Sequence, residues 1–133
     1  MSTEAEARNL VQEFFAAWTK GDADLAASFF TEDGVYHNIP MTRIEGREAI
    51  RETIAGWLSQ MDGIDFRFEN VLVQGNLVAM ERYDLVPAKD GSTKELGAMG
   101  IMELRDGKIA AWREYFDLAQ LVAISGDVGE PSP

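Results

Sequence analysis

Apolar residues in the first half of the chain recur at the three- and four-residue spacing that is typical of helices. Thr3 and Glu6 form a capping-box pattern ahead of the first apolar stripe, which ends before Gly21. The same spacing predicts a second, short helix over residues 23–30 and a third over 46–62. Three helices are therefore expected before the middle of the chain.

The pattern then changes to the two-residue alternation of strands. A short strand that ends at Ile39 is followed, after the third helix, by four long strands separated by turn signals. These strands are expected over 64–74, 77–86, 94–104 and 108–117. Helices first and strands later indicate an α+β fold, in which helices and a curved, mostly antiparallel sheet form a cone around an apolar pocket.

The chain has 133 residues, which is the size of one domain. We expect a single domain over 1–125, with a short apolar turn near its end. The Gly- and Pro-rich stretch 126–133 is expected to be a flexible tail.

One strand places charged residues on a face that should be apolar. Side chains alternate between the two faces of a strand, so Arg82 and Asp84 share a face with Val78, Met80 and Val86. Burying a charge is costly unless it is paired. This strand therefore predicts either a structural ion pair or a chemical site.

Two further segments repeat this mixture of polar and apolar residues. Tyr36 and Asn38 share one face of the first strand, whereas His37 points to the other face. Asp117 lies among apolar and aromatic residues at the end of the last strand. Arg113 and Glu114, just before it, fit a surface pair or a dimer contact.

The composition restricts the classes of partner. The net charge is −11 and the isoelectric point about 4.4, which argues against nucleic acid and anionic membrane surfaces as partners. Cysteine is absent, so disulfides and thiolate chemistry are excluded. We expect a cytoplasmic protein without a signal peptide, membrane span, metal site or cofactor.

The polar residues are suited to acid–base chemistry if the three strands line one cavity. Arg82 could then bridge Asp84 and Asp117, since a guanidinium has five donors. In an apolar pocket one of the two acids would take up a proton, which provides one acid and one base at neutral pH. Tyr36 and Asn38 could hold a water molecule against the ionised carboxylate.

Tyr36-x-Asn38, Arg82-x-Asp84 and Asp117 resemble the catalytic set of the limonene-1,2-epoxide hydrolases. These enzymes belong to the NTF2-like, or SnoaL-like, superfamily of α+β cones, and the resemblance covers nearly the whole chain in element order. It implies that a hydrophobic epoxide is opened to a vicinal diol in one step, without a covalent intermediate.

By this resemblance Asp117 is the general base, Asp84 the general acid, and Arg82 holds both carboxylates, while Tyr36 and Asn38 orient the water. The resemblance also implies a homodimer. The natural epoxide and the stereochemistry of opening stay open. Apolar residues expected to line the substrate pocket are Phe15, Trp18, Trp57, Met61, Met80, Val86, Met99, Ile101 and Ile124.

Two alternatives stay open on the same cone. An isomerase or cyclase of the ketosteroid isomerase or polyketide cyclase type could use Asp84 and Tyr36 as an oxyanion hole and Asp117 as the base. A non-catalytic module that binds apolar ligands would need no acid–base pair. Whether Arg82, Asp84 and Asp117 meet inside the cavity or lie on its rim distinguishes both enzyme hypotheses from the non-catalytic module.

Overall fold

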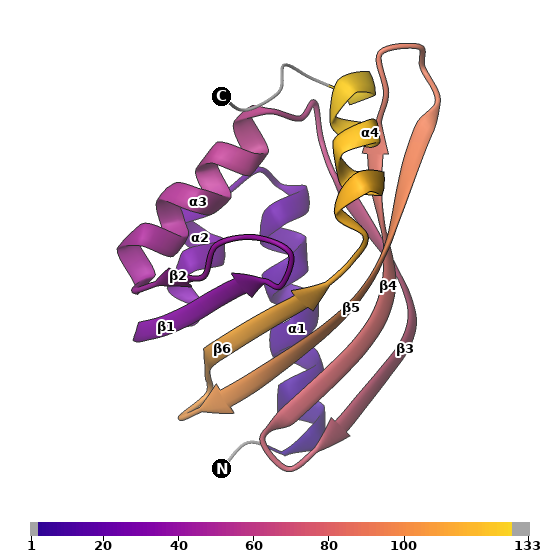
Figure 1. Ribbon diagram of the computed structural model, residues 1–133. Helices are drawn as coiled ribbons and strands as arrows, with labels where there is room; N and C mark the ends of the chain where they lie inside the picture. The colour runs from indigo at the N-terminus through magenta and orange to yellow at the C-terminus, as the bar shows by residue number, and fades with distance from the viewer. Residues whose placement is uncertain (1–2, 129–133) are drawn as a thin grey trace.

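The computed structural model describes residues 3–128, with side chains up to residue 126. Four helices and six strands form one α+β unit (Figure 1). In chain order they are α1 (Glu4–Thr19), α2 (Ala23–Ser28), β1 (Phe30–Asn38), β2 (Ile44–Glu45), α3 (Arg47–Ser59), β3 (Asp65–Gln74), β4 (Leu77–Pro87), β5 (Thr93–Arg105), β6 (Lys108–Tyr115) and α4 (Leu118–Val128).

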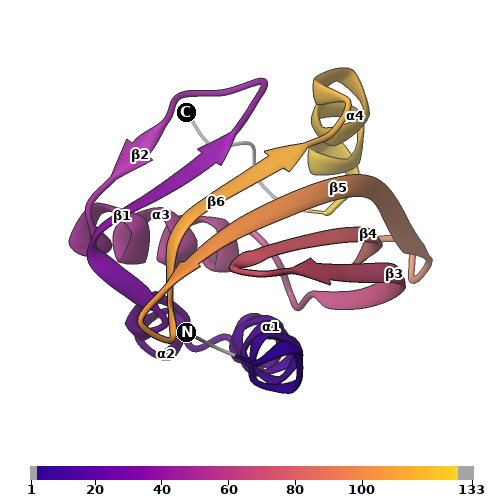
Figure 2. The same cartoon turned by 90° about the horizontal axis from the view of Figure 1, so that it is seen from below.

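The six strands form a single curved sheet in the order β2-β1-β6-β5-β4-β3. All neighbouring pairs are antiparallel except β1 and β6, which run parallel. Helices α1, α2 and α3 lie on the concave side of the sheet, and α4 stands beside β5 (Figures 1 and 2). The sheet thus has an inner face that packs against helices and an outer face that they leave uncovered. These features confirm the predicted α+β cone.

The helix starts follow their local sequence. Thr3 accepts a hydrogen bond from the Glu6 amide and the Glu6 side chain accepts one from the Thr3 amide, so the expected capping box is present. Asp22 caps α2 by accepting from the Leu25 amide. Before α3, Gly46 has a φ of 94°, a conformation that favours glycine.

The core lies between α1 and the inner face of the sheet. Phe14 is completely buried and meets its aromatic neighbours edge-on, at centroid distances of 5.0 to 6.5 Å. These neighbours are Phe15, Trp18, Phe29, Phe30 and Trp112. Fully buried Met80 and Met102 complete the apolar surface on β4 and β5. The expected apolar interior is therefore occupied largely by aromatic side chains.

The segment 29–39 differs from the prediction. Strand β1 begins at Phe30, so the predicted second helix is two residues too long. Residues 32–34, Glu-Asp-Gly, have a sequence typical of a turn, but they lie within β1, where the pairing with β6 shifts register between Phe30 and Val35. Gly34 allows this irregularity because a Cβ there would lie 3.1 Å from the Phe30 ring. These turn-type residues therefore form an irregular stretch within the strand.

Two further elements were not predicted as such. The two-residue strand β2 pairs with β1 at the sheet edge. The expected apolar turn near the end is the helix α4, which continues to Val128, and residues 129–133 of the predicted tail lie outside the described residues. No helix within 3–128 is both long enough and apolar enough to cross a membrane.

Candidate functional site

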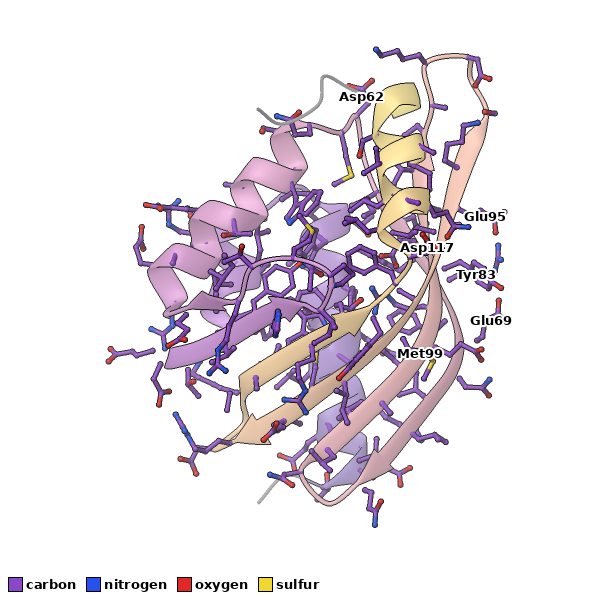
Figure 3. The ribbon with its side chains drawn as sticks, in the orientation of Figure 1. Asp62, Glu69, Tyr83, Glu95, Met99 and Asp117 are labelled. Carbon is purple, nitrogen blue, oxygen red and sulfur yellow. The ribbon has the colours of Figure 1, made fainter. Side chains whose placement is uncertain are left out.

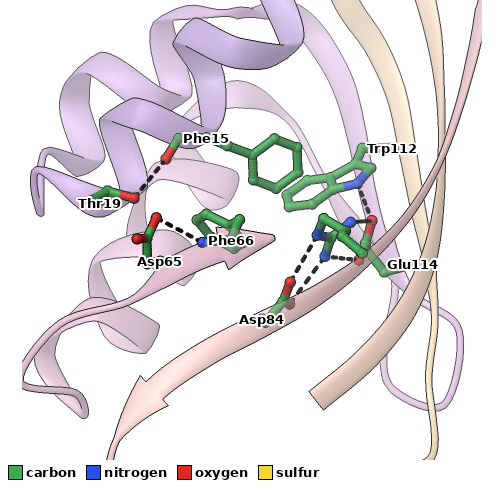
Figure 4. Close-up of polar contacts among 8 residues, drawn as sticks. Phe15, Thr19, Asp65, Phe66, Asp84, Trp112 and Glu114 are labelled. Carbon is green, nitrogen blue, oxygen red and sulfur yellow. Dashed lines mark hydrogen bonds and ion pairs between the residues drawn. The ribbon is translucent and has the colours of Figure 1, made fainter. Parts of the chain in front are cut away.

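Arg82 and Asp84 lie on the inner face of β4, as their alternation predicts. Their Cα partners on β3 are Phe68 and Phe66, whose side chains pack against the core. Arg82 Nε donates to Asp84 Oδ1 at 2.8 Å and Nη2 donates to Oδ2 at 3.1 Å, which makes a two-pronged ion pair (Figure 4). The two charges belong to one strand and hold each other in place.

The second partner of Arg82 is Glu114 on β6. Arg82 Nη1 donates to Glu114 Oε2 at 2.9 Å, and Nη2 donates to Oε1. The Trp112 indole Nε1 also donates to Glu114 Oε2, at 2.5 Å (Figure 4). Glu114 therefore receives three hydrogen bonds from two side chains. The register of the strands explains why Arg82 and Glu114 meet. Gly100 of β5 is the Cα partner of both Met80 on β4 and Glu114 on β6, and Arg82 follows Met80 by two residues on the same face.

Asp84, Arg82 and Glu114, hereafter the inner triad, form a nearly dry site with one open end. The exposed fraction of the side chain is 2% for Arg82, 4% for Glu114 and 16% for Asp84. The guanidinium carbon lies 4.7 Å from the centroid of the Phe15 ring and 5.8 Å from that of Phe66. Solvent or a ligand therefore has its best access to the triad at Asp84.

The surroundings shift the pKa values of Asp84 and Arg82 through different causes. Burial raises the pKa of Asp84 above its ordinary value of 3.8 and outweighs the charge and hydrogen bonds of Arg82, which lower it. Burial would lower the pKa of Arg82, but the charges of Glu114 and Asp84 outweigh it and raise that pKa. Arg82 thus stays a cation, and Asp84 favours its protonated form more than an exposed aspartate does.

Tyr36 and Asn38 reach the same face from β1. They are the Cα partners of Trp112 and Glu114 in the parallel β1–β6 pairing. The ring of Tyr36 stacks on Trp112 at a centroid distance of 4.4 Å and an angle of 7°. Burial raises the pKa of the Tyr36 hydroxyl, although a hydrogen bond with Asn38 acts in the opposite direction. Tyr36 is therefore a neutral donor beside the inner triad.

Asp117 occupies a different place from the one expected. Its side chain is exposed, and Oδ1 accepts a hydrogen bond from the Gln120 amide at 3.1 Å, as a cap at the start of α4 does. Figure 3 shows it at the base of α4. The acids that hydrogen-bond to Arg82 among residues 3–128 are Asp84 and Glu114, so the predicted bridge from Arg82 to Asp117 is not present.

The interpretation of Glu114 as a surface or dimer residue is wrong, because Glu114 is buried. The sequence contained a signal that Glu114 faces the interior. Glu114 stands two positions after Trp112 and so shares its face. Tyr36, Asn38, Arg82 and Asp84 lie on the faces that the alternation requires. His37 lies on the opposite face of β1, where its Cα partner is Arg113.

The predicted lining residues fall into three groups. Phe15, Trp18, Met80 and Val86 are buried, and Trp57, Met61 and Ile124 are half-buried. Met99 and Ile101 alternate with the inward-facing residues of β5 and lie on the outer face of the sheet, where Met99 is 48% exposed (Figure 3). These two do not line the interior.

Two surface hollows occur within residues 3–128, and the residues that line them include Arg82 but neither Asp84 nor Glu114. One, of about 240 Å³, lies on the outer face of the sheet around Tyr83, Gly97 and Met99. The other, of about 460 Å³, lies between the ends of α1 and α3 and is lined by Trp18, Leu58 and Met61 among others. Within 3–128, histidines and acids do not gather in groups of three or more that could hold a metal ion. The inner triad holds two carboxyl groups on one guanidinium, and burial raises the pKa of one of them, Asp84, so the arrangement is suited to proton transfer by carboxyl groups.

Two of the proteins similar to this chain are named epoxide hydrolases. An epoxide hydrolase of Mycobacterium tuberculosis, EphG, is 28% identical over 109 residues, which is 81% of this chain and 71% of that protein. The structure of an LEH-like epoxide hydrolase from M. tuberculosis superposes with a TM-score of 0.75 at 25% identity, covering 90% of this chain and 88% of that one.

The same fold also occurs in proteins with other names. A putative isomerase from Bacillus subtilis superposes with a TM-score of 0.82 at 21% identity, covering 95% of this chain and 96% of that one. At this identity the likeness concerns the fold alone. Residues 11–112 match the SnoaL-like domain, a stretch that spans most of the chain and includes Tyr36, Asn38, Arg82 and Asp84. The chain therefore belongs to the SnoaL-like domain family.

Proposed function

We propose that this protein is an epoxide hydrolase that opens a hydrophobic epoxide to a vicinal diol by direct attack of water. The observation that carries the proposal is the inner triad, in which one buried guanidinium holds two carboxyl groups in different environments. Relatives that are named epoxide hydrolases, at 28% and 25% identity, support it.

Asp84 is the proposed general acid. An epoxide is a poor electrophile until its oxygen receives a proton, and the raised pKa of Asp84 keeps a proton available. Asp84 is also the most accessible member of the inner triad, so it can meet a ligand that enters from outside. As the ring C–O bond breaks, the ring oxygen takes the Asp84 proton and becomes a hydroxyl.

Glu114 is the proposed general base, in place of the expected Asp117. Its Oε2 accepts from Arg82 and Trp112, whereas its Oε1 accepts from Arg82 alone. A carboxylate oxygen has two acceptor positions, so Oε1 keeps one for a water molecule. That water gives a proton to Oε1 while its oxygen bonds to the epoxide carbon. Glu114 then releases this proton to solvent, and solvent reprotonates Asp84. Water is the only co-reactant, so the proposal includes no cofactor.

Asn38 and Tyr36 are the proposed residues that orient this water. Asn38 is the Cα partner of Glu114, so its amide lies on the same face beside the carboxylate. Tyr36 cannot turn freely, because its ring is buried and stacked on Trp112. Two polar groups held in place on one face can hold the attacking water in the orientation that the reaction requires.

The decisive experiment measures diol formation in ¹⁸O-labelled water from limonene oxide, cyclohexene oxide and styrene oxide. We expect labelled diol in the first turnover. Glu114→Gln and Asp84→Asn should each lose roughly 10²–10⁴-fold in kcat, whereas Asp117→Asn should keep it. If Asp117→Asn is inactive and Glu114→Gln is active, the base is Asp117. Unlabelled first-turnover diol would contradict direct attack, and absence of diol from all three epoxides would contradict the activity.

A second candidate is an isomerase, and one observation favours it. Asp84 with a raised pKa and a neutral, buried Tyr36 are the two donors that an oxyanion hole needs. Arg82 counts against this candidate, because pairing with both acids serves a two-carboxylate reaction better. Turnover of a 3-keto-Δ5-steroid by a protein that leaves epoxides intact would favour the isomerase. Ligand binding without any turnover would favour a non-catalytic module.

The proposal includes a homodimer formed through the outer face of the sheet. That face exposes Tyr83, Met99 and Tyr115 together, although large apolar side chains are usually covered. Sedimentation equilibrium should give twice the mass of the chain, and Met99→Lys should shift it toward the monomer. A monomer at micromolar concentration would contradict this part of the proposal.

A further inference from the structure

Gly100 stands where the Glu114 carboxylate needs space. It lies in β5 directly beside Glu114 in the β5–β6 pairing, and its side of the strand is buried. A Cβ atom added at this position would lie 2.0 Å from Glu114 Oε2 and 3.1 Å from Glu114 Cδ. It would also lie 3.1 Å from Arg82 Nη1. The carboxylate therefore occupies the volume that any other residue at position 100 would fill.

The carboxylate cannot move aside without losing its partners. Oε2, the atom nearest to this position, accepts hydrogen bonds from Arg82 Nη1 at 2.9 Å and from Trp112 Nε1 at 2.5 Å. Trp112 is itself held by the stacked ring of Tyr36 and by the edge of Phe14. The donors approach from fixed side chains, so the space over Gly100 is the place where one oxygen can meet both of them.

A second glycine in the same strand shows that this arrangement is specific. Gly97 also lies in β5, and neither glycine has a positive φ, so backbone conformation requires neither of them. At Gly97 a Cβ would meet the Tyr83 ring at 3.4 Å, which is an ordinary contact on the outer face. The two positions lie three residues apart in one strand and face opposite sides of the sheet, so Gly97→Ala is a control for Gly100→Ala that makes the same change away from Glu114.

We propose that Gly100 and Trp112 are positioning residues for Glu114. The missing side chain at 100 lets a glutamate reach far enough to meet the indole and the guanidinium at once. This inference rests on the proposed function in so far as Glu114 acts as the base. Its structural part, the dependence of the Trp112–Glu114 hydrogen bond on Gly100, is independent of any activity.

The structural part is tested by NMR of the indole N–H groups. The chain has three tryptophans, and Trp18→Phe and Trp57→Phe assign the resonances. The Trp112 proton, bonded to a carboxylate, should resonate downfield, and the Trp18 indole, buried without a partner, is an internal reference. Gly100→Ala should move the Trp112 resonance upfield, whereas Gly97→Ala should leave it in place. Equal spectra for the two variants would overturn the proposal.

The catalytic part is tested by a double-mutant cycle on kcat for epoxide opening. A displacement of the base by about 1 Å can cost about 10²-fold in rate, so Gly100→Ala should lose this much in kcat with KM nearly unchanged. Glu114→Asp is one methylene shorter and withdraws the carboxylate from position 100. In that background, adding Gly100→Ala should cause little further loss, and Gly97→Ala should have no effect in either background.

The combined results distinguish a failure of the positioning role of Gly100 from a failure of the proposed function. Additive losses in the cycle, together with an unmoved Trp112 resonance, would overturn the positioning role. If the resonance moves but the wild-type protein opens none of the epoxides, the proposed function fails while the structural role of Gly100 stands. A thermal unfolding scan of Gly100→Ala beside Gly97→Ala checks that both variants are folded.

Discussion

The inner and outer faces of the sheet carry the same set of interactions in two environments. Inside, Arg82 pairs with Asp84 and Glu114 and lies over the Phe15 ring. Outside, Arg67 of β3 pairs with Glu69 and Glu95 and lies 4.8 Å from the Tyr83 ring centroid. Figure 3 shows Glu69, Tyr83 and Glu95 projecting from the outer face.

The two arginines differ in how far their side chains are exposed to solvent. The Arg82 side chain is 2% exposed, whereas that of Arg67 and of Glu95 is 48% exposed. Charges in water interact weakly, because the solvent screens them and competes for their hydrogen bonds. The same two-acid pattern is therefore screened by solvent on the outer face of the single chain, whereas on the inner face it forms a fixed site in which burial shifts the pKa of Asp84.

The largest expected difference comes from removing the two arginines. Arg82→Met should destabilise the fold by about 3–5 kcal/mol, because it leaves two buried acids without their cation. Arg67→Met should change the free energy of unfolding of a single chain little, since its two acids are exposed there. Urea unfolding at neutral pH measures both. Equal effects of the two substitutions would contradict the contrast between the faces.

The next effect is a pH dependence that belongs to Asp84. Its folded-state pKa is raised, so its contribution favours the folded state fully below the unfolded pKa, near 3.8. This contribution is lost as the pH rises through the folded-state pKa, and it amounts to about 1.4 kcal/mol for every tenfold difference between the folded and unfolded acid dissociation constants. Relative to Asp84→Asn, the wild-type protein should thus lose free energy of unfolding as the pH rises from 3.8.

Urea titrations of both proteins from about pH 3.5 to about pH 8 measure this difference, with Glu95→Gln as the control from the outer face. A difference that stays flat with pH would contradict the raised pKa. If Asp84 is the general acid, kcat should fall over the same pH interval.

A smaller effect is expected at Asp117. Asp117→Ala removes the cap of α4 and should cost about 1 kcal/mol locally. The amides at the start of α4 should then exchange faster with deuterium, while those of β4 and β6 keep their rates. Faster exchange in β6 around Glu114 would indicate that Asp117 supports the inner triad after all.

The smallest effect is expected on the outer face. Glu95→Gln removes one exposed partner of Arg67, and Glu69 remains. The melting temperature should stay within the error of the measurement, and turnover should not change. A clear fall in either quantity would show that the outer pair is structural, for example because a second copy of the chain covers it.

Much of the fold and part of the site could be predicted from the chain alone. Strand periodicity was enough to place Arg82 and Asp84 on the inner face, and Tyr36 and Asn38 together on one face. The same reasoning failed in β5, where Met99 was assigned to the wrong face, and in β1, where turn-type residues form an irregular stretch within the strand. Alternation is informative only when its starting face is known.

By itself, the sequence determined the first three helices, the four long strands, the α+β class and the presence of a charged pair on an apolar face, because these depend on local spacing. Only the tertiary structure decided which acid meets Arg82. Glu114 lies 32 residues away from it and three residues before Asp117, and the choice between them depends on the register of β4, β5 and β6. Register is set by the packing of the whole sheet, which no local pattern contains.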